Sequence, residues 1–461
     1  MYSWLVLGLV AAAAAAGYDY ESDPDIYHNK WWGPEGMEED TSIRPFKVEW
    51  KKKMVEDLLY RLKNRRRLTP SLKGTNYNYG LNTDTMSYWL DYWANNYNFT
   101  AREEYLNQYP QFMTDIQGLS IHFIRIVPEI PEGKYSIPLL MLHGYPGSVR
   151  EYYDVLWDLT KPADNRDFVI EVVVPSLPGY GYSDATNLVG LGFAEMAFIF
   201  KNLMNRLGHE KFYVQGGDWG ALIGANMATF FPDIILGYHT TMPVAATDEA
   251  LTLITAGSLY PAAVVPTELT NRLYPLQNTL EYFAQDFGYL HIQAAKSDAL
   301  GVCIGESPTS LLGWFLHLFS IFSRRTNGND PMGGLEIYSR DQIIDNLMIY
   351  WDTETATTSI RLYAESFNKK TFRSGFLNAP TTVPTVAVQA LGEIFYFPPA
   401  ALNTKFTNLV AVDVLDDYGH FLAMEQPQLF VELVLSGLQR IMQFNKQNMD
   451  GQSESNCSTS A

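Results

Sequence analysis

Cysteine is almost absent from this sequence, in which only Cys303 and Cys457 occur among 461 residues. Two cysteines so far apart exclude a disulfide framework, a CxxC redox motif and a zinc site built on thiolates. No pair of histidines has the spacing of metal ligands beside a cysteine or a glutamate. We therefore expect no structural metal and no cofactor.

Positive charge is also scarce. Lys and Arg total 33 against 51 Asp and Glu, so the formal net charge is −18. Such an acidic chain argues against a nucleic-acid partner. The one basic run, residues 63–67, ends a helical pattern that has Met54, Leu58 and Leu62 on one face. Cations at the end of a helix need no partner, because they face the negative end of its dipole.

The longest apolar run lies at the N-terminus, where MYSWLVLGLVAAAAAAG is apolar for about sixteen residues. As a helix this run would span ~24 Å, which is short for a bilayer core. No Lys or Arg precedes it, and its alanine-rich end leads into Gly17, as at a signal-peptide cleavage site. Residues 1–17 are therefore a short membrane anchor or a cleaved signal segment, and the sequence leaves both open.

Aromatic residues, in contrast, are abundant, with 29 Tyr, 25 Phe and 10 Trp in the chain. Together with a hydrophobic content of 47%, they allow a large core in one elaborated domain or in a core with an insert. They also suit an apolar ligand pocket, although large cores use aromatic residues as well.

The order of patterns along the chain predicts an α/β fold. Strand-like runs alternate with helical stretches, stop for a long helical section, and then return, which is typical of a mostly parallel sheet with helices on both faces and an insert. The expected strands are 120–127, 137–144, 169–177, 212–217, 383–391 and 409–417, and the expected helices include 49–66, 83–96, 195–207 and 428–444.

These patterns divide the chain into five regions. After the apolar segment 1–17, we expect an N-terminal extension at 18–115, a core formed by 116–242 and 360–445, a helical lid at 243–359, and a disordered tail at 446–461. The tail is assigned to disorder because its composition is polar and low in hydrophobic residues.

One short stretch, YVQGGDWGALIG at 213–224, places an acid where an apolar strand turns into an apolar helix. Gly216, Gly217 and Gly220 are spaced like the glycines of the G-x-S-x-G nucleophile elbow, but the central residue is Asp218. The sharp turn leaves no room for side chains beside the central residue. By itself the stretch fits equally well an aspartate that caps a helix.

Three further strand ends carry polar residues. His143-Gly144-Tyr145-Pro146 follows one strand, Glu393 follows 383–391, and His420 follows 409–417. The ends of parallel strands meet at one edge of the sheet, where sites form. Each residue alone has an ordinary structural reading, as a loop acid or a hydrogen-bonding histidine. The chain order of nucleophile, acid and histidine is nevertheless that of the α/β-hydrolase fold.

An aspartate at the elbow indicates which bond is attacked. A serine that attacked a saturated carbon would form an ether, which water does not readily cleave. A carboxylate forms an ester instead, and a water activated by histidine can hydrolyse it. Asp218 therefore predicts displacement at an epoxide or a carbon–halogen bond, and argues against lipase, esterase and peptidase activity.

The sequence resembles the microsomal-type epoxide hydrolases, and most closely the juvenile hormone epoxide hydrolases of insects. The resemblance covers nearly the whole chain after the N-terminal segment. It is carried by collinear motifs that include WWGPE, LLMLHGYPGSVREYYD, PSLPGYGYSDA, VQGGDWGALIG, GYLHIQAAKSDALG, RLYAESF and YGHFLAMEQP.

The resemblance implies a role for each of these residues. Asp218 would be the nucleophile, His420 the general base and Glu393 the acid that orients it. Two lid tyrosines, Tyr289 and Tyr363, would donate to the epoxide oxygen and protonate it as the ring opens. Without the resemblance, either tyrosine would be read as ordinary packing.

The resemblance also implies an oxyanion hole and shows three departures. The backbone amides of Tyr145 and Trp219 would form the hole, with a cis bond before Pro146. The family usually has Trp at Tyr145 and often Gly at Tyr418, and the loop that follows Glu393 differs from the family's pattern. These departures leave the catalytic set intact, but can alter pocket lining and loop position.

The implied substrate is an apolar epoxide, juvenile hormone or a related terpenoid, with a xenobiotic epoxide as an alternative. A haloalkane dehalogenase uses the same aspartate chemistry but needs halide-binding Trp or Asn groups instead of paired tyrosines. A weakly catalytic hormone-binding protein is a third alternative, which the intact triad opposes. Family members are typically anchored in the endoplasmic reticulum, so the resemblance implies membrane association through residues 1–17, with secretion after cleavage as the alternative.

Overall fold

The computed structural model describes residues 29–458. The apolar segment 1–17 lies outside the described residues, so the model does not bear on its role as anchor or signal. Within residues 29–458, no helix combines the length and the apolar character that crossing a membrane requires.

A nine-stranded sheet forms the centre of the fold, with the strand order β1-β2-β3-β5-β4-β6-β7-β8-β9. The strands from β4 to β9 are parallel, and β1 to β3 add an antiparallel edge. The bounds are β1 Arg44–Phe46, β2 Gln111–Ile116, β3 Leu119–Ile126, β4 Tyr135–Leu142, β5 Phe168–Pro175, β6 Phe212–Gly216, β7 Ile235–Thr240, β8 Thr385–Gln389 and β9 Leu409–Val414. This arrangement confirms the predicted α/β-hydrolase fold.

The central strands follow from their sequences. All eight residues of β5, FVIEVVVP, are buried, as expected for a strand covered on both faces. The sequence patterns missed β1, β2 and β7. These strands are short or mix polar with apolar residues, as in QFMTDI and ILGYHT, so they lack a continuous apolar signal.

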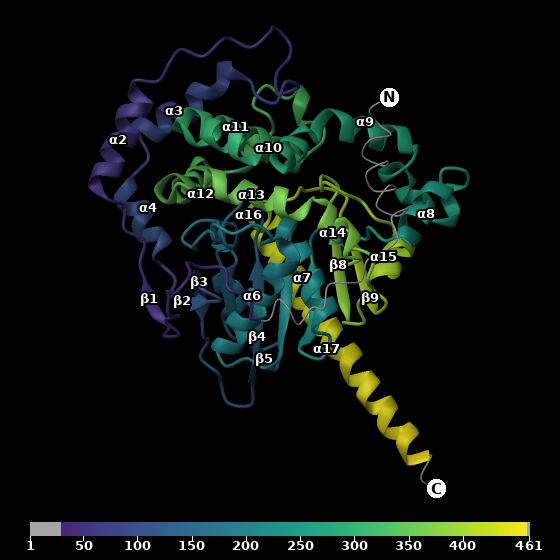
Figure 1. Ribbon diagram of the computed structural model, residues 1–461. Coiled ribbons are helices and arrows are strands. Elements are labelled where there is room, and N and C mark those ends of the chain that lie inside the picture. Colours follow the sequence, from purple (N-terminus) through teal and green to yellow (C-terminus); the bar gives the residue numbers. More distant parts are fainter. Residues whose placement is uncertain (1–28, 459–461) are drawn as a thin grey trace.

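Helices cover both faces of the sheet (Figure 1). On β6, Tyr213 and Val214 point to opposite faces because successive side chains alternate. The helix α7 (Asp218–Phe230) packs near Val214 through Gly224, and the C-terminal helix α17 (Pro427–Ser458) brings Ile441 close to Tyr213. The other helices of the core are α5 Leu156–Thr160, α6 Phe193–Arg206, α15 Pro399–Lys405 and α16 Leu422–Glu425.

Seven helices between β7 and β8 form the lid. They are α8 Asp248–Ala256, α9 Leu276–Asp286, α10 Gly288–Gly305, α11 Pro308–Ser323, α12 Arg340–Thr353, α13 Ala356–Ser366 and α14 Lys369–Arg373. Figure 1 shows α10 to α13 above the sheet. The boundary expected at 359/360 falls inside α13, and strands resume only at β8. Because ATTSIRLYAES keeps a helical apolar face, the helix continues through that boundary.

The N-terminal extension packs beside the lid through α2 (Lys52–Lys63), α3 (Met86–Asn95) and α4 (Phe99–Leu106). Asp345 on α12, which is fully buried, joins three parts of the fold. Its carboxylate accepts hydrogen bonds from Arg102 of the extension over 2.9 Å and from Arg150 of the core over 3.0 Å. Breaking such a buried network is costly, because it leaves an unpaired charge away from water.

The C-terminal helix is longer than the sequence suggested. We expected a helix at 428–444 followed by disorder from 446, but α17 continues to Ser458 and projects from the body of the protein (Figure 1). Lys446, Gln447 and Met449 have good intrinsic helix propensity, so they extend an existing helix without needing a packing partner.

Candidate active site

The turn between β6 and α7 has the geometry of a nucleophile elbow. Asp218 is the first residue of α7 and has a φ of 49°, in the left-handed region that side chains rarely adopt. A Cβ on Gly216 would overlap the backbone of Gly220, and a Cβ on Gly220 would overlap the carbonyl of Leu142 on β4. The glycines are therefore required by close backbone packing, as the motif predicts.

The carboxylate of Asp218 is buried and held at one oxygen. The backbone amide of Tyr145 donates to its Oδ1 over 2.7 Å, and the absence of a side chain on Gly144 leaves room for the carboxylate. Burial raises the pKa of Asp218, while the charge of His420 and the amides of Tyr145 and Trp219 oppose that rise. The two amides predicted to form an oxyanion hole thus both act on this carboxylate. The expected cis bond between Tyr145 and Pro146 is present.

His420 lies between two carboxylates. Its Nε2 is 3.5 Å from Oδ2 of Asp218, and its Nδ1 is 2.7 Å from Oε1 of Glu393. Burial alone would lower the pKa of His420, but the negative charges of Glu393, Asp218 and Glu151 outweigh it and raise this pKa to about 9. The structure therefore brings together Asp218, His420 and Glu393, the three residues that the sequence predicted as nucleophile, base and acid.

The loops that carry Glu393 and His420 are fixed against the lid. A Cβ on Gly392 or on Gly419 would overlap the backbone of Ser323 at the end of α11. The amide of His420 donates to the carbonyl of Phe322 over 2.9 Å. The altered sequence around these loops thus still supports a close contact between the core and the lid.

Tyr289 and Tyr363 lie on two lid helices, α10 and α13, close enough to Asp218 for its charge to act on both phenols. Their ring centroids are 6.3 Å apart and nearly perpendicular. Both rings are buried, and burial together with the charge of Asp218 raises the pKa of each phenol well above its ordinary value. Neither hydroxyl takes part in a hydrogen bond within residues 29–458. The two phenols therefore stay protonated and can donate to a ligand.

Sequence reasoning missed a carboxyl group that supports the histidine loop. Glu425 accepts hydrogen bonds from the amides of Gly419 over 2.7 Å and Phe421 over 3.3 Å, which flank His420. The hydroxyl of Tyr338 also donates to it over 2.9 Å. The only sequence signal for this role was that a glutamate follows the histidine by five positions, in GHFLAME. A glutamate in a short helix usually faces solvent, so the pattern did not single out Glu425.

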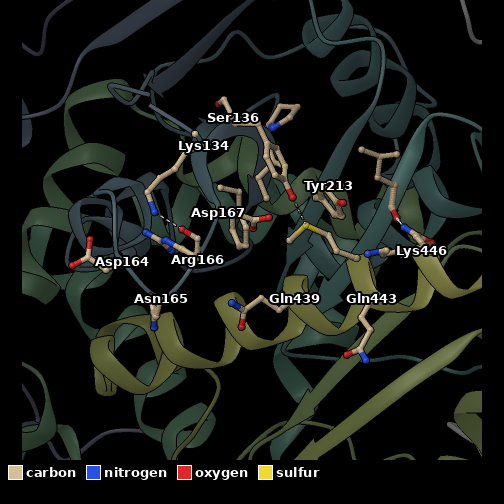
Figure 2. Close-up of a pocket in the computed structure, with 18 of the residues that line it drawn as sticks. Lys134, Ser136, Asp164, Asn165, Arg166, Asp167, Tyr213, Gln439, Gln443 and Lys446 are labelled. Carbon is tan, nitrogen blue, oxygen red and sulfur yellow. Dashed lines mark hydrogen bonds between the residues drawn. The ribbon is translucent and has the colours of Figure 1, made fainter. Parts of the chain in front are cut away.

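A separate cavity of about 1070 Å³ lies at the opposite end of the strands, between the start of β4 and α17 (Figure 2). Two of its polar side chains have partners within the protein. Lys134 donates to the carbonyls of Ala163 and Arg166, and the hydroxyl of Tyr135 contacts Sδ of Met442 over 3.7 Å. None of the residues predicted for catalysis lines this cavity. The part of the chain that the structure describes contains no cluster of His, Cys, Asp and Glu able to hold a metal ion.

Comparisons with known proteins agree with this geometry. Residues 43–152 match the family model for the epoxide hydrolase N terminus, and residues 137–291 match that for the alpha/beta hydrolase fold. The chain is 46% identical to the juvenile hormone epoxide hydrolase of Bombyx mori over 90% of its length and 91% of the relative. It is 36% identical to epoxide hydrolase 1 of Oryctolagus cuniculus, covering 92% of this chain and 95% of that one. The crystal structure of the silkworm enzyme superposes with a TM-score of 0.89 at 46% identity, covering 91% and 99% of the two chains.

Proposed function

The chain belongs to the microsomal-type epoxide hydrolases, and from that premise we propose that it converts juvenile hormone or a related apolar terpenoid epoxide to a diol through an ester of Asp218. The observation that carries this proposal is the position of the Asp218 carboxylate. One oxygen is held by the amide of Tyr145 over 2.7 Å, and the other lies 3.5 Å from Nε2 of His420.

The first step is attack by Asp218 on a carbon of the epoxide. Because Oδ1 is held by Tyr145, Oδ2 is the oxygen free to attack. A new C–O bond forms, the epoxide C–O bond breaks, and a proton from Tyr289 or Tyr363 goes to the released oxygen. Burial of Asp218 favours this step, since a carboxylate stripped of water is more nucleophilic.

The second step is hydrolysis of the ester, in which His420 removes a proton from water. Ester formation removes the negative charge of Asp218, which is one of the charges that raise the pKa of His420. The pKa of His420 therefore falls after the first step, and the imidazole becomes an effective base when it is needed. The amides of Tyr145 and Trp219 stabilise the oxyanion that forms during hydrolysis.

The aromatic surroundings support an apolar substrate. Rings of Trp219 and Tyr363 lie 4.6 Å apart, and Tyr145 packs edge-on against both Phe315 and Tyr363. The juvenile hormone epoxide hydrolase of Bombyx mori, which is 46% identical to this chain, supports the hormone as the substrate of this chain as well. A xenobiotic epoxide is the alternative that a substrate panel would test.

A dehalogenase is the second candidate, because the indole nitrogen of Trp219 is buried and has no hydrogen-bond partner within residues 29–458. Such an N–H beside the nucleophile could hold a halide. The two unbonded phenols favour the epoxide, which needs a proton donor where a halide needs none. We expect no halide release from a terpenoid chloride under conditions that open the matching epoxide.

The domain organisation that we propose is the one expected from the sequence, with an extension at 18–115, a core at 116–242 and 360–445, and a lid at 243–359. The hydrogen bonds that Asp345 accepts from Arg102 and Arg150 support it within the described residues, because they join α12 to α4 and to the core. We further propose that residues 1–17 associate with the membrane of the endoplasmic reticulum, a role that the apolar sequence supports. Carbonate extraction combined with N-terminal sequencing tests this, and a soluble chain that begins near Gly17 would refute it.

The central test uses two variants and a juvenile hormone as substrate. Asp218→Ala should form no diol, because no ester can form. His420→Gln should form the ester but not hydrolyse it, so intact mass spectrometry should show the protein gaining the mass of one substrate. The matching alkene, which lacks the epoxide oxygen, is the control and should leave the mass unchanged. Normal turnover by Asp218→Ala would refute the proposal.

A further inference from the structure

Two glycines of the H-G-Y-P-G loop make room for two carboxyl groups. The missing side chain of Gly144 accommodates the carboxylate of Asp218. In the same way, a Cβ on Gly147 would lie only 2.8 Å from Oε2 of Glu151. The same Cβ would lie 3.8 Å from the ring of Phe421, the residue after His420. The loop thus brings a second carboxyl group close enough to His420 for the charges of Glu151 and His420 to act on each other.

The loop that positions Glu151 is held firmly by the lid. Asn346 donates to the carbonyl of Pro146, and the hydroxyl of Tyr350 donates to the carbonyl of Gly147, each over 2.7 Å. Glu151 itself lies in a short 3-10 helix, Val149–Tyr152, whose first turn is capped by Ser148. Its carboxyl group therefore has a fixed location rather than a mobile one.

The carboxyl group of Glu151 is buried but has no partner. Its side chain takes part in no hydrogen bond or ion pair within residues 29–458, although the residue is only 9% exposed. Burial raises the pKa of Glu151 to about 8. The negative charges of Asp218 and Glu393 add to this rise, and the charge of His420 opposes it. Buried carboxyl groups are normally hydrogen-bonded, so this one calls for an explanation.

We propose that Glu151 positions the water that hydrolyses the ester, by accepting a hydrogen bond from it while His420 accepts the other. This inference rests on the proposed function. The acceptor is available in both protonation states, since a neutral carboxyl group keeps its carbonyl oxygen. No other assigned residue fixes the direction of the water, because the tyrosines serve the epoxide oxygen and the amides serve the oxyanion.

The atoms of the step balance as follows. The water oxygen attacks Cγ of the Asp218 ester, and one water proton goes to Nε2 of His420. The bond from Cγ to the alkyl oxygen then breaks, and that oxygen takes the proton from His420 to complete the diol. The second water proton leaves as Asp218 regains its carboxylate, and it restores the tyrosine that protonated the epoxide oxygen.

The test separates the two half-reactions in Glu151→Met, which keeps the volume but removes the acceptor. The probe is the epoxide that gives the covalent adduct with His420→Gln. Rapid quenching and intact mass spectrometry should show alkylation at the wild-type rate and decay of the ester slowed on the order of 10–100-fold. Glu151→Gln keeps a carbonyl acceptor, so its decay rate should lie between those of Glu151→Met and the wild type.

A matched control is Glu195→Gln, which alters another glutamate that is only 6% exposed. Glu195 accepts from the amide of Gly192 over 3.1 Å and from Lys370 over 2.9 Å, so it is held structurally. Glu195→Gln should change the midpoint of thermal unfolding but should not change the ratio of the alkylation rate to the rate of ester decay. If Glu151→Met does not fold, Glu151→Asp serves instead, since a shorter side chain withdraws the carboxyl group from the water.

The outcomes are distinct. Two results in Glu151→Met would overturn this inference: ester decay at the wild-type rate, or an equal decrease in the rates of alkylation and ester decay. If His420→Gln still traps its adduct, the proposed function stands in both cases. Absence of an adduct in His420→Gln would overturn the proposed function and this inference with it.

Discussion

The indole N–H of Trp314, on lid helix α11, donates a hydrogen bond to the hydroxyl of Tyr145 over 3.0 Å. Tyr145 is also the residue whose backbone amide holds Asp218. An indole only donates hydrogen bonds, so the Trp that the family usually has here could not accept from Trp314. The tyrosine therefore adds a polar connection between the lid and the loop that holds the nucleophile.

Tyr145→Phe should weaken this connection without removing the oxyanion hole, because the backbone amide is unchanged. Loss of one such bond typically costs about 0.5–1.5 kcal/mol of folding free energy. We expect a lower midpoint of thermal unfolding and turnover reduced by less than about tenfold. Calorimetry and a diol assay measure the two effects. Complete loss of turnover in a folded variant would mean that the hydroxyl takes part in the chemistry.

The elbow, the order of Asp218, Glu393 and His420, and the main strands could be predicted because each has a local sequence signal. A strained turn demands glycines within a few positions, and buried parallel strands demand continuous apolar runs. The boundary expected at 359/360 falls inside α13, because the amphipathic pattern of this helix is the same on both sides of it.

The supporting carboxyl groups could not be predicted, since their environment comes from distant parts of the chain. Glu425 accepts a hydrogen bond from Tyr338, which lies 87 positions earlier, and Glu151 occupies the space left by Gly147. In the sequence, either acid is indistinguishable from one that faces solvent. Their significance depends on tertiary packing, which no local pattern encodes.

Tyr289→Phe and Tyr363→Phe should each slow ring opening and leave the protein folded, since only a hydroxyl group is lost. A general acid typically accelerates a step by ~10²–10⁴-fold. Because two phenols serve one oxygen, each single variant should retain part of the rate, and the double variant should lose most of it. Single-turnover formation of the ester, followed by mass spectrometry, measures this step directly.

Tyr180→Phe is the matched control for those variants. Tyr180 is fully buried near Asp218, and its hydroxyl has no hydrogen-bond partner within residues 29–458. Its variant should alkylate at close to the wild-type rate. An unchanged alkylation rate in the double variant Tyr289→Phe/Tyr363→Phe would remove both residues from the mechanism.

Ester hydrolysis should speed up with rising pH, since the base must be neutral. The pKa of His420 is about 9 in the free enzyme, with Asp218 among the charges that raise it. The ester removes that charge, so the midpoint of the rise should lie below 9. Decay of the ester should be measured in single turnovers between about pH 6 and pH 10. A rate that is flat or falls across this range would contradict the assignment of His420 as the base.

Tyr418→Gly should relieve strain next to the histidine. Tyr418 has a φ of 70°, a left-handed conformation that costs a side-chain-bearing residue about 1–2 kcal/mol and costs glycine little. The position of His420 should persist, because Glu425 still holds the amide of Gly419. We therefore expect turnover within about threefold of the wild type. Tyr418→Ala is the matched control, since it also removes the ring but keeps the strain, and it should be less stable than Tyr418→Gly by about 1 kcal/mol. Equal unfolding free energies for the two variants in denaturant titrations would show that this backbone conformation stores no strain.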